Sequence, residues 1–392
     1  MGASFSKAVR NRWVDLWARV GLDARGEFGI VGAGSILRCA SLSFLVYFVP
    51  LALLRRRLRD PAHFRSAVAF GLFAGLYRSV RVLVARLVPQ EHRQAHQAAP
   101  FVAGALGGLA AVLVDSSFLS SLFVVWWCVR ALRSSPWVQR VEAHPAGPVA
   151  VMCFASGLLS PAGLVAPREH HPSYFRFLVR FFECSGARFS DFHSPPAGLT
   201  IGQTVAPDGR LFAWYARYVR SVVWESAKIY VPLHLVWAAL RLPARTSLRV
   251  VLSNTARSIA FLSTYTCSMM AMLLADSHFF SASPPRWHLH LWTPLAGLAV
   301  LVERSNRQAE LAFFCLAHAI NSVYNHARLR GLVRPNNLIG TLLLMVASGR
   351  IMQVTAMTPG RGAHLLFGEK MGRLTQKHSQ SNPDKPMDEK SE

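Results

Sequence analysis

Ionisable residues lie inside apolar stretches of this chain, where a charge is costly unless it is paired or functional. Glu225 and Lys228 are three residues apart, so on a helix they can pair across one turn, and His234 follows on a similar face. Asp115 and Glu303 end two other apolar stretches at matching positions. These five residues are a candidate polar pathway or headgroup site between helices. The alternative is that they mark helix ends, with Glu225 and Lys228 as a self-satisfied pair.

Histidines offer a different chemistry, that of a membrane di-iron desaturase or hydroxylase, which holds its irons with several histidine boxes. The groups present are His92 with His96, His170 with His171, and His288 with His290. No HxxHH box occurs, and His92 and His96 fall in a short Gln-rich segment that solvation explains. This enzyme is therefore the less favoured alternative.

Other catalytic and cofactor motifs are absent from the sequence. It contains no GxSxG, P-loop, dinucleotide fingerprint or HExxH motif. Its six cysteines form no CxxC pair, which argues against a structural zinc site or a disulfide framework. We therefore expect no catalytic residue, no metal site and no cofactor, and a protein that is not an enzyme.

The composition is that of a membrane protein. Of the 392 residues 52% are hydrophobic and only 16% are charged, and the mean hydropathy is positive. Soluble domains carry roughly 25% charged residues. The apolar residues gather in ten stretches of about the length that crosses a hydrocarbon core. These stretches are 39–54, 66–88, 99–114, 118–133, 148–166, 221–241, 248–275, 289–302, 309–325 and 337–357. The sequence predicts an all-α polytopic bundle of eight to ten membrane helices.

The net charge of +23 is distributed at the ends of these stretches rather than in one basic patch. Clusters such as Arg55–Arg57 with Arg59 flank a span, where arginines meet anionic lipid headgroups. No basic stretch carries interleaved aromatics or a recognition fold. The sequence therefore indicates the lipid bilayer and its anionic headgroups as partners, and excludes nucleic acid. Self-association or other organelle membrane proteins remain open as partners.

The two halves of the chain resemble each other in order and spacing. Paired features are Phe48–Leu51 with Tyr230–Leu233, Gly108-Leu109 with Gly297-Leu298, Asp115 with Glu303, Trp126–Cys128 with Phe313–Cys315, and Ala155–Gly157 with Ala347–Gly349. All of these pairs keep their order and a nearly constant offset, which chance does not explain. The sequence predicts an internal duplication, as many transporters show.

The predicted organisation has five parts. They are an N-terminal amphipathic segment 1–38, a first helical repeat 39–166, a central basic Pro/Gly-rich loop 167–220, a second repeat 221–369 and a disordered polar tail 370–392. Five crossings per half would invert the halves relative to each other, and four would leave them parallel. The arginines after 39–54 favour four, with that stretch lying in the interface.

Small residues indicate close helix packing in the first half. Gly71 and Gly75 form one GxxxG motif, and Gly104 and Gly108 form another on the next predicted helix. Because lipid supplies no hydrophobic force between helices, small residues that let backbones approach drive association. The two motifs predict a packed helix pair.

The N-terminus fits the N-myristoylation pattern, with Gly2 exposed after removal of Met1 and Ser6 at the expected position. One myristoyl chain binds membranes only marginally, so a second signal is needed. The following segment supplies it, because Trp13, Leu16 and Trp17 share one helical face. We expect a cytosolic, membrane-apposed N-terminus.

Several stretches resemble the transmembrane protein 135 family. They are Ala155–Gly157 leading to Pro167 and His171–Tyr174, Lys228–His234, and Gly297 to Ser305. The resemblance implies a multi-pass protein of mitochondria or peroxisomes that is related to the mitochondrial translocase and peroxisomal membrane protein superfamily. The central loop departs from the family pattern, since Cys184 alone accompanies the His193-Ser194-Pro195 step.

The resemblance also implies a part in organelle dynamics and lipid handling. The favoured hypothesis is therefore a non-enzymatic, multi-pass organelle membrane protein in mitochondrial or peroxisomal dynamics and lipid handling. A repeat-built secondary transporter is the alternative, because duplicated halves with prolines at Pro50 and Pro232 are typical of alternating-access folds. The di-iron enzyme is third.

Overall fold

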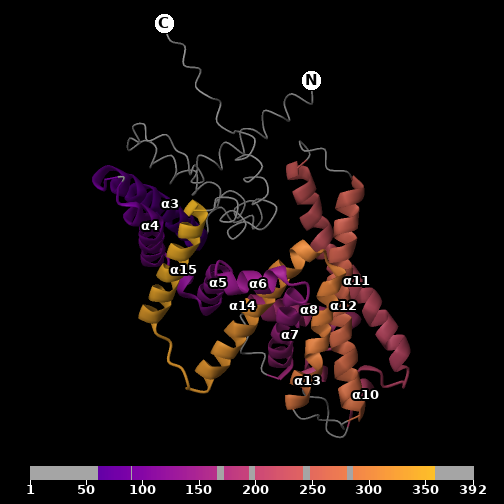
Figure 1. The fold of residues 1–392 in the computed structure, drawn as a ribbon. Helices are drawn as coiled ribbons and strands as arrows, with labels where there is room; N and C mark the ends of the chain where they lie inside the picture. Colours follow the sequence, from indigo (N-terminus) through magenta and orange to yellow (C-terminus); the bar gives the residue numbers. More distant parts are fainter. Residues whose placement is uncertain are drawn as a thin grey trace. The chain divides into compact units, whose positions relative to one another are not determined.

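The computed structural model describes residues 61–89, 91–165, 172–193, 199–241, 248–279 and 286–357 (Figure 1). Within these ranges the regular structure is helical, and no strand occurs. The N-terminal segment 1–38 with Gly2, the stretch 39–54 and the tail 370–392 lie outside the described residues. The all-α prediction is confirmed for the described part of the chain.

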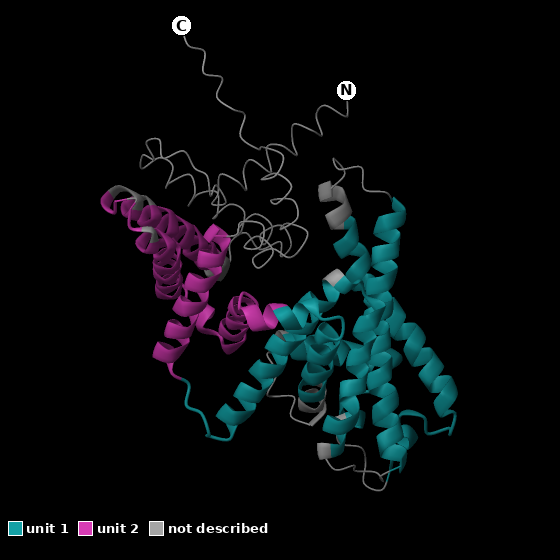
Figure 2. Ribbon diagram, in the orientation of Figure 1, with its two compact units in different colours: residues 1–7, 140–335 teal, residues 8–139, 336–392 magenta. Residues whose placement is uncertain are grey.

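The described residues form two compact units (Figure 2). Unit 2 combines residues up to 139 with those from 336 onward. Its helices are α3 (Pro61–Leu87), α4 (Arg93–Val114), the 3₁₀ turn η2 (Ser116–Leu119), α5 (Ser121–Leu132) and α15 (Asn337–Met357). Helix α4 packs against both α3 and α15, and α15 also packs against α5. Helix α6 (Pro136–Ala143) contains the boundary between the units.

Unit 1 comprises residues 140–335 among those described. Its elements are α7 (Gly147–Val165), α8 (Pro172–Phe182), η4 (Glu183–Ser185), α9 (Phe189–His193), α10 (Ile201–Val205), α11 (Leu211–Arg241), α12 (Leu248–Phe279), α13 (Arg286–Ala296), η6 (Gly297–Val302) and α14 (Ser305–Leu329). Helix α7 packs against α13, η6 and α14, and α11 packs against α12. Aromatic side chains from α8 to α11, including Phe181, Trp214 and Tyr218, fill much of its core.

The compact units do not follow the two sequence halves. Helix α7 is the last apolar stretch of the first half, yet it lies among helices of the second half in unit 1. Helix α15 is the last stretch of the second half, yet it packs against α4 and α5 in unit 2. The last helix of each sequence half therefore lies in the compact unit that is formed mainly by the other half.

Glycines set the close approach of helices in unit 2. A β-carbon on Gly104 would lie 2.8 Å from the Ser348 carbonyl oxygen, and one on Gly349 would lie 2.8 Å from the Phe101 carbonyl oxygen. Gly108 also faces Ser348. The packed pair α3–α4 exists, but the predicted glycine motif on α4 serves the α15 contact instead. Its neighbour Gly107 faces α3, through Phe73.

The other predicted glycine motif lies on α3. Gly71 and Gly75 are buried, and the Gly75 carbonyl accepts a hydrogen bond from the Ser79 hydroxyl at 2.9 Å.

The central segment 167–220 was predicted as a loop, and where it is described it is mostly helical. It holds α8, η4, α9, α10 and the first turns of α11. The reason is visible in α8, which starts with Pro172 at its first position and turns Phe177 and Phe181 toward the core while Arg176 and Arg180 stay exposed. Its arginines and prolines obscured this amphipathic pattern.

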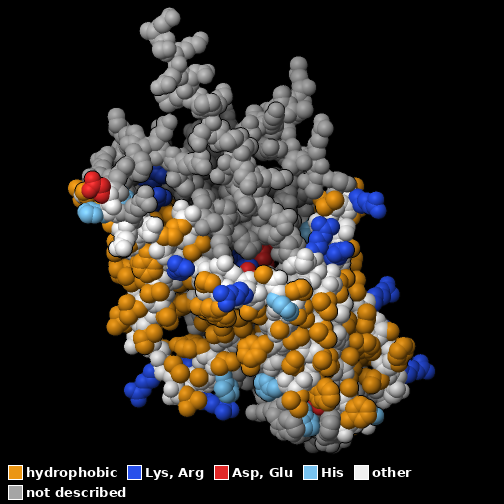
Figure 3. Space-filling view, in the orientation of Figure 1, with side chains coloured by type: hydrophobic (Ala, Val, Ile, Leu, Met, Phe, Trp, Pro, Cys, Tyr) orange, Lys and Arg blue, Asp and Glu red, His pale blue; other side chains and the backbone are white. Residues whose placement is uncertain are grey.

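Three described helices are long and apolar enough to cross a membrane, namely Gln94–Val114, Leu248–Phe279 and Asn337–Met357. Shorter apolar helices accompany them at Ser121–Leu132, Gly147–Leu159 and His288–Val302. Large apolar side chains such as Leu113, Leu252 and Val346 are exposed, and hydrophobic side chains cover much of the visible face of each unit (Figure 3). A soluble monomer rarely exposes so much contiguous apolar surface.

Substituting Gly104 by Ala tests the packing of α4 on α15. The new methyl group would press on the Ser348 carbonyl and on Met352, so we expect a loss of about 1–3 kcal/mol that outweighs the helix-propensity gain of up to about 1 kcal/mol. Thermal unfolding in detergent measures it. Gly340→Ala on α15 is the matched control, because its methyl group would meet only a Leu119 side-chain carbon at 3.4 Å. Equal midpoints for the two variants would refute the close contact.

Candidate functional site

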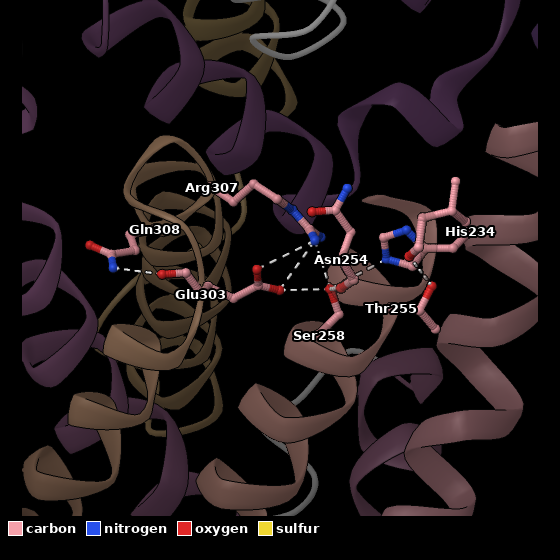
Figure 4. A network of polar contacts seen from close by, with 8 residues as sticks. His234, Asn254, Thr255, Ser258, Glu303, Arg307 and Gln308 are labelled. Atoms are coloured by element: carbon pink, nitrogen blue, oxygen red, sulfur yellow. Dashed lines mark hydrogen bonds and ion pairs between the residues drawn. The ribbon is translucent and has the colours of Figure 1, made fainter. Parts of the chain in front are cut away.

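Ser258 is the centre of a buried polar network in unit 1 (Figure 4). Its hydroxyl donates to Oε1 of Glu303 at 2.7 Å, and Nη1 of Arg307 donates to the hydroxyl oxygen at 2.6 Å. Nε2 of His234 lies 3.3 Å from the same oxygen. The network therefore joins α11, α12, α14 and the end of η6 through one side chain.

The number of donors and acceptors on a serine fixes the protonation pattern. A hydroxyl has one proton to donate and two lone pairs to accept with. If its proton points to Glu303, the oxygen accepts from Arg307 and from a protonated Nε2 of His234. The Asn254 carbonyl, 3.1 Å away, competes for the same proton. A change in the contact between His234 and Ser258 therefore alters the hydrogen bond that Ser258 donates to Glu303.

Local structure holds the charges in place. Glu303 caps the end of η6, and α14 begins two residues later, so Arg307 reaches back one turn to the carboxylate at 3.2 Å. Gln308 donates to the Glu303 carbonyl at 2.9 Å. Glu303 is only 3% exposed, and a buried carboxylate is tolerated when paired and hydrogen-bonded in this way.

Unit 2 holds a related arrangement around Asp115. Its carboxylate accepts from the Ser66 hydroxyl of α3 and, at 2.9 Å, from the Ser117 backbone N–H as the cap of η2. Burial acts to raise the pKa of Asp115, but the hydrogen bonds from Ser66 and Ser117 and the charge of Arg65 lower it overall. A helix serine therefore donates to the carboxylate that follows the next helix in each unit.

A second kind of contact, between a glycine and a helix from the other half of the sequence, occurs inside each unit. Gly108 faces Leu344 and Ser348 of α15, and its sequence counterpart Gly297 faces Met152 and Cys153 of α7. By the spacing of Gly157 and Gly349, Met152 is the counterpart of Leu344, while Cys153 lies three residues before the counterpart of Ser348. Gly349 of α15 faces Phe101, while its counterpart Gly157 on α7 faces His290 and Pro294.

The five predicted polar residues fall into three places. His234 and Glu303 are brought together by Ser258, and Asp115 belongs to unit 2. Glu225 and Lys228 form the expected pair at 2.5 Å, outside the network. Arg180 of α8 also contacts Glu225 at 2.5 Å.

Ser66, Ser258 and Arg307 were missed by the sequence interpretation. One signal was available, because the dipeptides Arg65-Ser66 and Arg257-Ser258 occupy matching places in the two halves. Ser66 and Ser258 are the same number of residues apart as Gly157 and Gly349.

The histidines that raised the di-iron alternative have other surroundings. Nδ1 of His290 lies 2.7 Å from the Gly157 carbonyl, Nε2 of His96 lies 3.3 Å from the Pro89 carbonyl, and Nδ1 of His288 lies 3.6 Å from Asp276. Among the residues with described positions, no three His, Cys, Asp or Glu side chains gather as metal ligands. His170 and His171 fall outside those positions.

No family model matches the chain, and neither a curated protein nor a solved structure does.

Replacing Ser258 by Ala tests whether it holds the network together. The change removes the proton donated to Glu303 and the oxygen that Arg307 and His234 contact, so the free energy of unfolding should fall by about 1–3 kcal/mol. Ser253→Ala on the same helix is the control. A midpoint of thermal unfolding equal to the control's would show that the network carries no stability.

The lowered pKa of Asp115 predicts a pH dependence. A carboxyl with a depressed folded-state pKa stabilises the fold above its ordinary value of 3.8, and that contribution disappears as pH falls through the folded-state pKa. The wild type should therefore be more stable than Asp115→Asn at neutral pH, and this difference should shrink below pH 3.8. Unfolding midpoints across pH measure it. A difference that grows on acidification would contradict the assignment.

Proposed function

We propose that this chain is a non-enzymatic, multi-pass organelle membrane protein that is involved in mitochondrial or peroxisomal dynamics and lipid handling. The observation that supports this proposal most directly is the combination of apolar outer helix faces with a hydrogen-bonded carboxylate inside each unit, of which Glu303 is buried and paired with Arg307. Apolar exteriors suit a hydrocarbon surrounding, and ionisable groups inside such proteins face the interior and are paired.

An internal duplication is part of this proposal, with eight to ten crossings in total. The recurring contacts support it: serine to carboxylate in Ser66–Asp115 and Ser258–Glu303, and glycine to the last helix of the other half at Gly108 and Gly297. Two unrelated sets of helices have no reason to repeat the same contact types at paired positions. The exchange of last helices would then be a property of the duplicated architecture.

Organelle identity rests on the sequence. The stretches similar to the transmembrane protein 135 family support a mitochondrial or peroxisomal membrane, with a cytosolic, acylated N-terminus at Gly2. Lipid bilayer and anionic headgroups are the partners that this placement implies.

A repeat-built secondary transporter is the second candidate, and the Ser258 network favours it. Glu303 is buried, and Ser258 links it to Arg307 and His234 between helices, an arrangement of ionisable groups that is typical of substrate and proton pathways.

Localisation tests the first proposal. A C-terminally tagged chain should resist alkaline carbonate extraction and overlap with mitochondrial or peroxisomal markers. Gly2→Ala should weaken the membrane attachment of the N-terminal segment without releasing the protein, because a single acyl chain adds little to spanning helices. Release of the wild type by carbonate would rule out the integral membrane proposal, and plasma-membrane signal that moves with Gly2→Ala would rule out the organelle.

Phospholipid exchange between the leaflets of reconstituted vesicles separates the two candidates. If lipid movement passes the Ser258 network, Glu303→Gln should slow it by about tenfold or more, since it leaves Arg307 without its counter-charge. Asp208→Asn, in the exposed turn before α11, is the control. Equal exchange for wild type, both variants and empty vesicles would leave no lipid movement to explain and would favour transport of another solute.

A further inference from the structure

One carboxylate in unit 1 holds two cations from different helices. Lys228 of α11 contacts Oε1 of Glu225 and Arg180 of α8 contacts Oε2, each at 2.5 Å. The carboxylate side chain is 14% exposed, whereas those of Arg180 and Lys228 are 48% and 45% exposed. Two exposed cationic groups therefore contact one mostly buried carboxylate, and the three side chains together carry one net positive charge. Because they share one carboxylate, they lie close enough together for one phosphate to reach both.

The surface beside this pair is basic and aromatic. Arg217, Arg220, Trp224 and Lys228 recur at three- and four-residue spacing, so they share one face of α11, and all four are exposed. We call this face the basic stripe. The Lys228 ammonium lies 5.6 Å from the centre of the Trp224 ring. Cations around a large exposed aromatic ring are typical of protein surfaces at the headgroup level of a membrane.

The same face becomes apolar further along α11. Val231 and Leu235 continue the helical spacing, and both are exposed. The order along the helix is therefore cations with tryptophan, then aliphatic side chains. An anionic phospholipid has the matching order of a phosphate headgroup followed by acyl chains.

We propose that the basic stripe, together with Arg180, binds an anionic phospholipid whose phosphate contacts Arg180 and Lys228. The inference rests on the proposed membrane location. Arginine can offer two parallel N–H donors to a phosphate, and lysine adds a point charge. A zwitterionic lipid has no net charge to balance the excess on the stripe and binds more weakly.

Glu225 has a distinct part in this site. It holds the two cations in position, and it also competes with the phosphate for them. Removing its charge therefore raises the positive excess and strengthens lipid binding, whereas removing the cations weakens it. A merely structural ion pair would instead lower stability in every variant and leave lipid preference unchanged.

The test uses the full-length chain in a neutral detergent, titrated with phosphatidylglycerol or with phosphatidylcholine of the same acyl chains. Native mass spectrometry counts retained lipids, and thermal unfolding reports their stabilisation. The double variant Arg180→Gln/Lys228→Gln should bind phosphatidylglycerol about tenfold more weakly than wild type. Glu225→Gln should bind it at least as tightly as wild type. The matched control is Arg328→Gln/Arg330→Gln at the exposed end of α14, which removes the same charge and should change little.

Each result has a defined meaning. Loss of binding in the first double variant alone, weakened further by salt in the wild type, supports the site. Equal loss in the control pair, or unchanged binding in both, overturns it, as does weakened binding in Glu225→Gln. Inorganic phosphate that stabilises the protein as well as the lipid does would overturn the lipid as occupant. If the protein still resists carbonate extraction, such results reject the lipid site and not the membrane location.

Discussion

Close approach of two helices at a glycine is the constraint on which the rest of this structure depends. In unit 2 α4 meets α15 at Gly104, Gly108 and Gly349, and in unit 1 α13 and η6 meet α7 at Gly157 and Gly297. A β-carbon on Gly297 would lie 2.5 Å from the Cys153 α-carbon, so the backbones touch there. In lipid, where hydrophobic force between helices is absent, such contacts supply the packing.

This packing also positions the carboxylates. Asp115 follows α4 directly and Glu303 ends η6, so each acidic residue is fixed by the glycine-bearing element before it. A serine from the preceding long helix then donates to it, Ser66 in one unit and Ser258 in the other. The units differ in their cations: Arg307 pairs with Glu303 one turn along α14, while Arg65 acts on Asp115 at a distance. The fuller network in unit 1 makes it the better candidate for a polar pathway between helices.

The positions of most helices could be predicted, because the ends of an apolar stretch of helical length indicate where the helix begins and ends. The stretches from 66–88 to 337–357 became helices, and Glu225 and Lys228 pair as their spacing predicts. The partners of those helices could not be predicted: Gly104 was assigned to α3 and meets α15, which lies far away in the chain. Helix α8 was missed because Arg176 and Arg180 interrupt its phenylalanines in a Pro-rich segment. Ser258 was missed because a serine on an apolar helix is distinguished only by its match with Ser66 in the other half, and its neighbours come from three other elements.

A disulfide across the α4–α15 contact is the most direct test of this account. The β-carbon of a residue at position 108 would lie 3.2 Å from that of residue 348, near the separation of about 3.5–4.5 Å found in disulfides. In membranes, the pair Gly108→Cys/Ser348→Cys should cross-link on mild oxidation, so that fragments cut in the central segment stay joined until reduced. The control pair Gly108→Cys/Leu342→Cys, with an exposed position on α15, should not. If the first pair stays unlinked, or both pairs link equally, α15 does not pack on α4 and the exchange of last helices between the two halves is wrong.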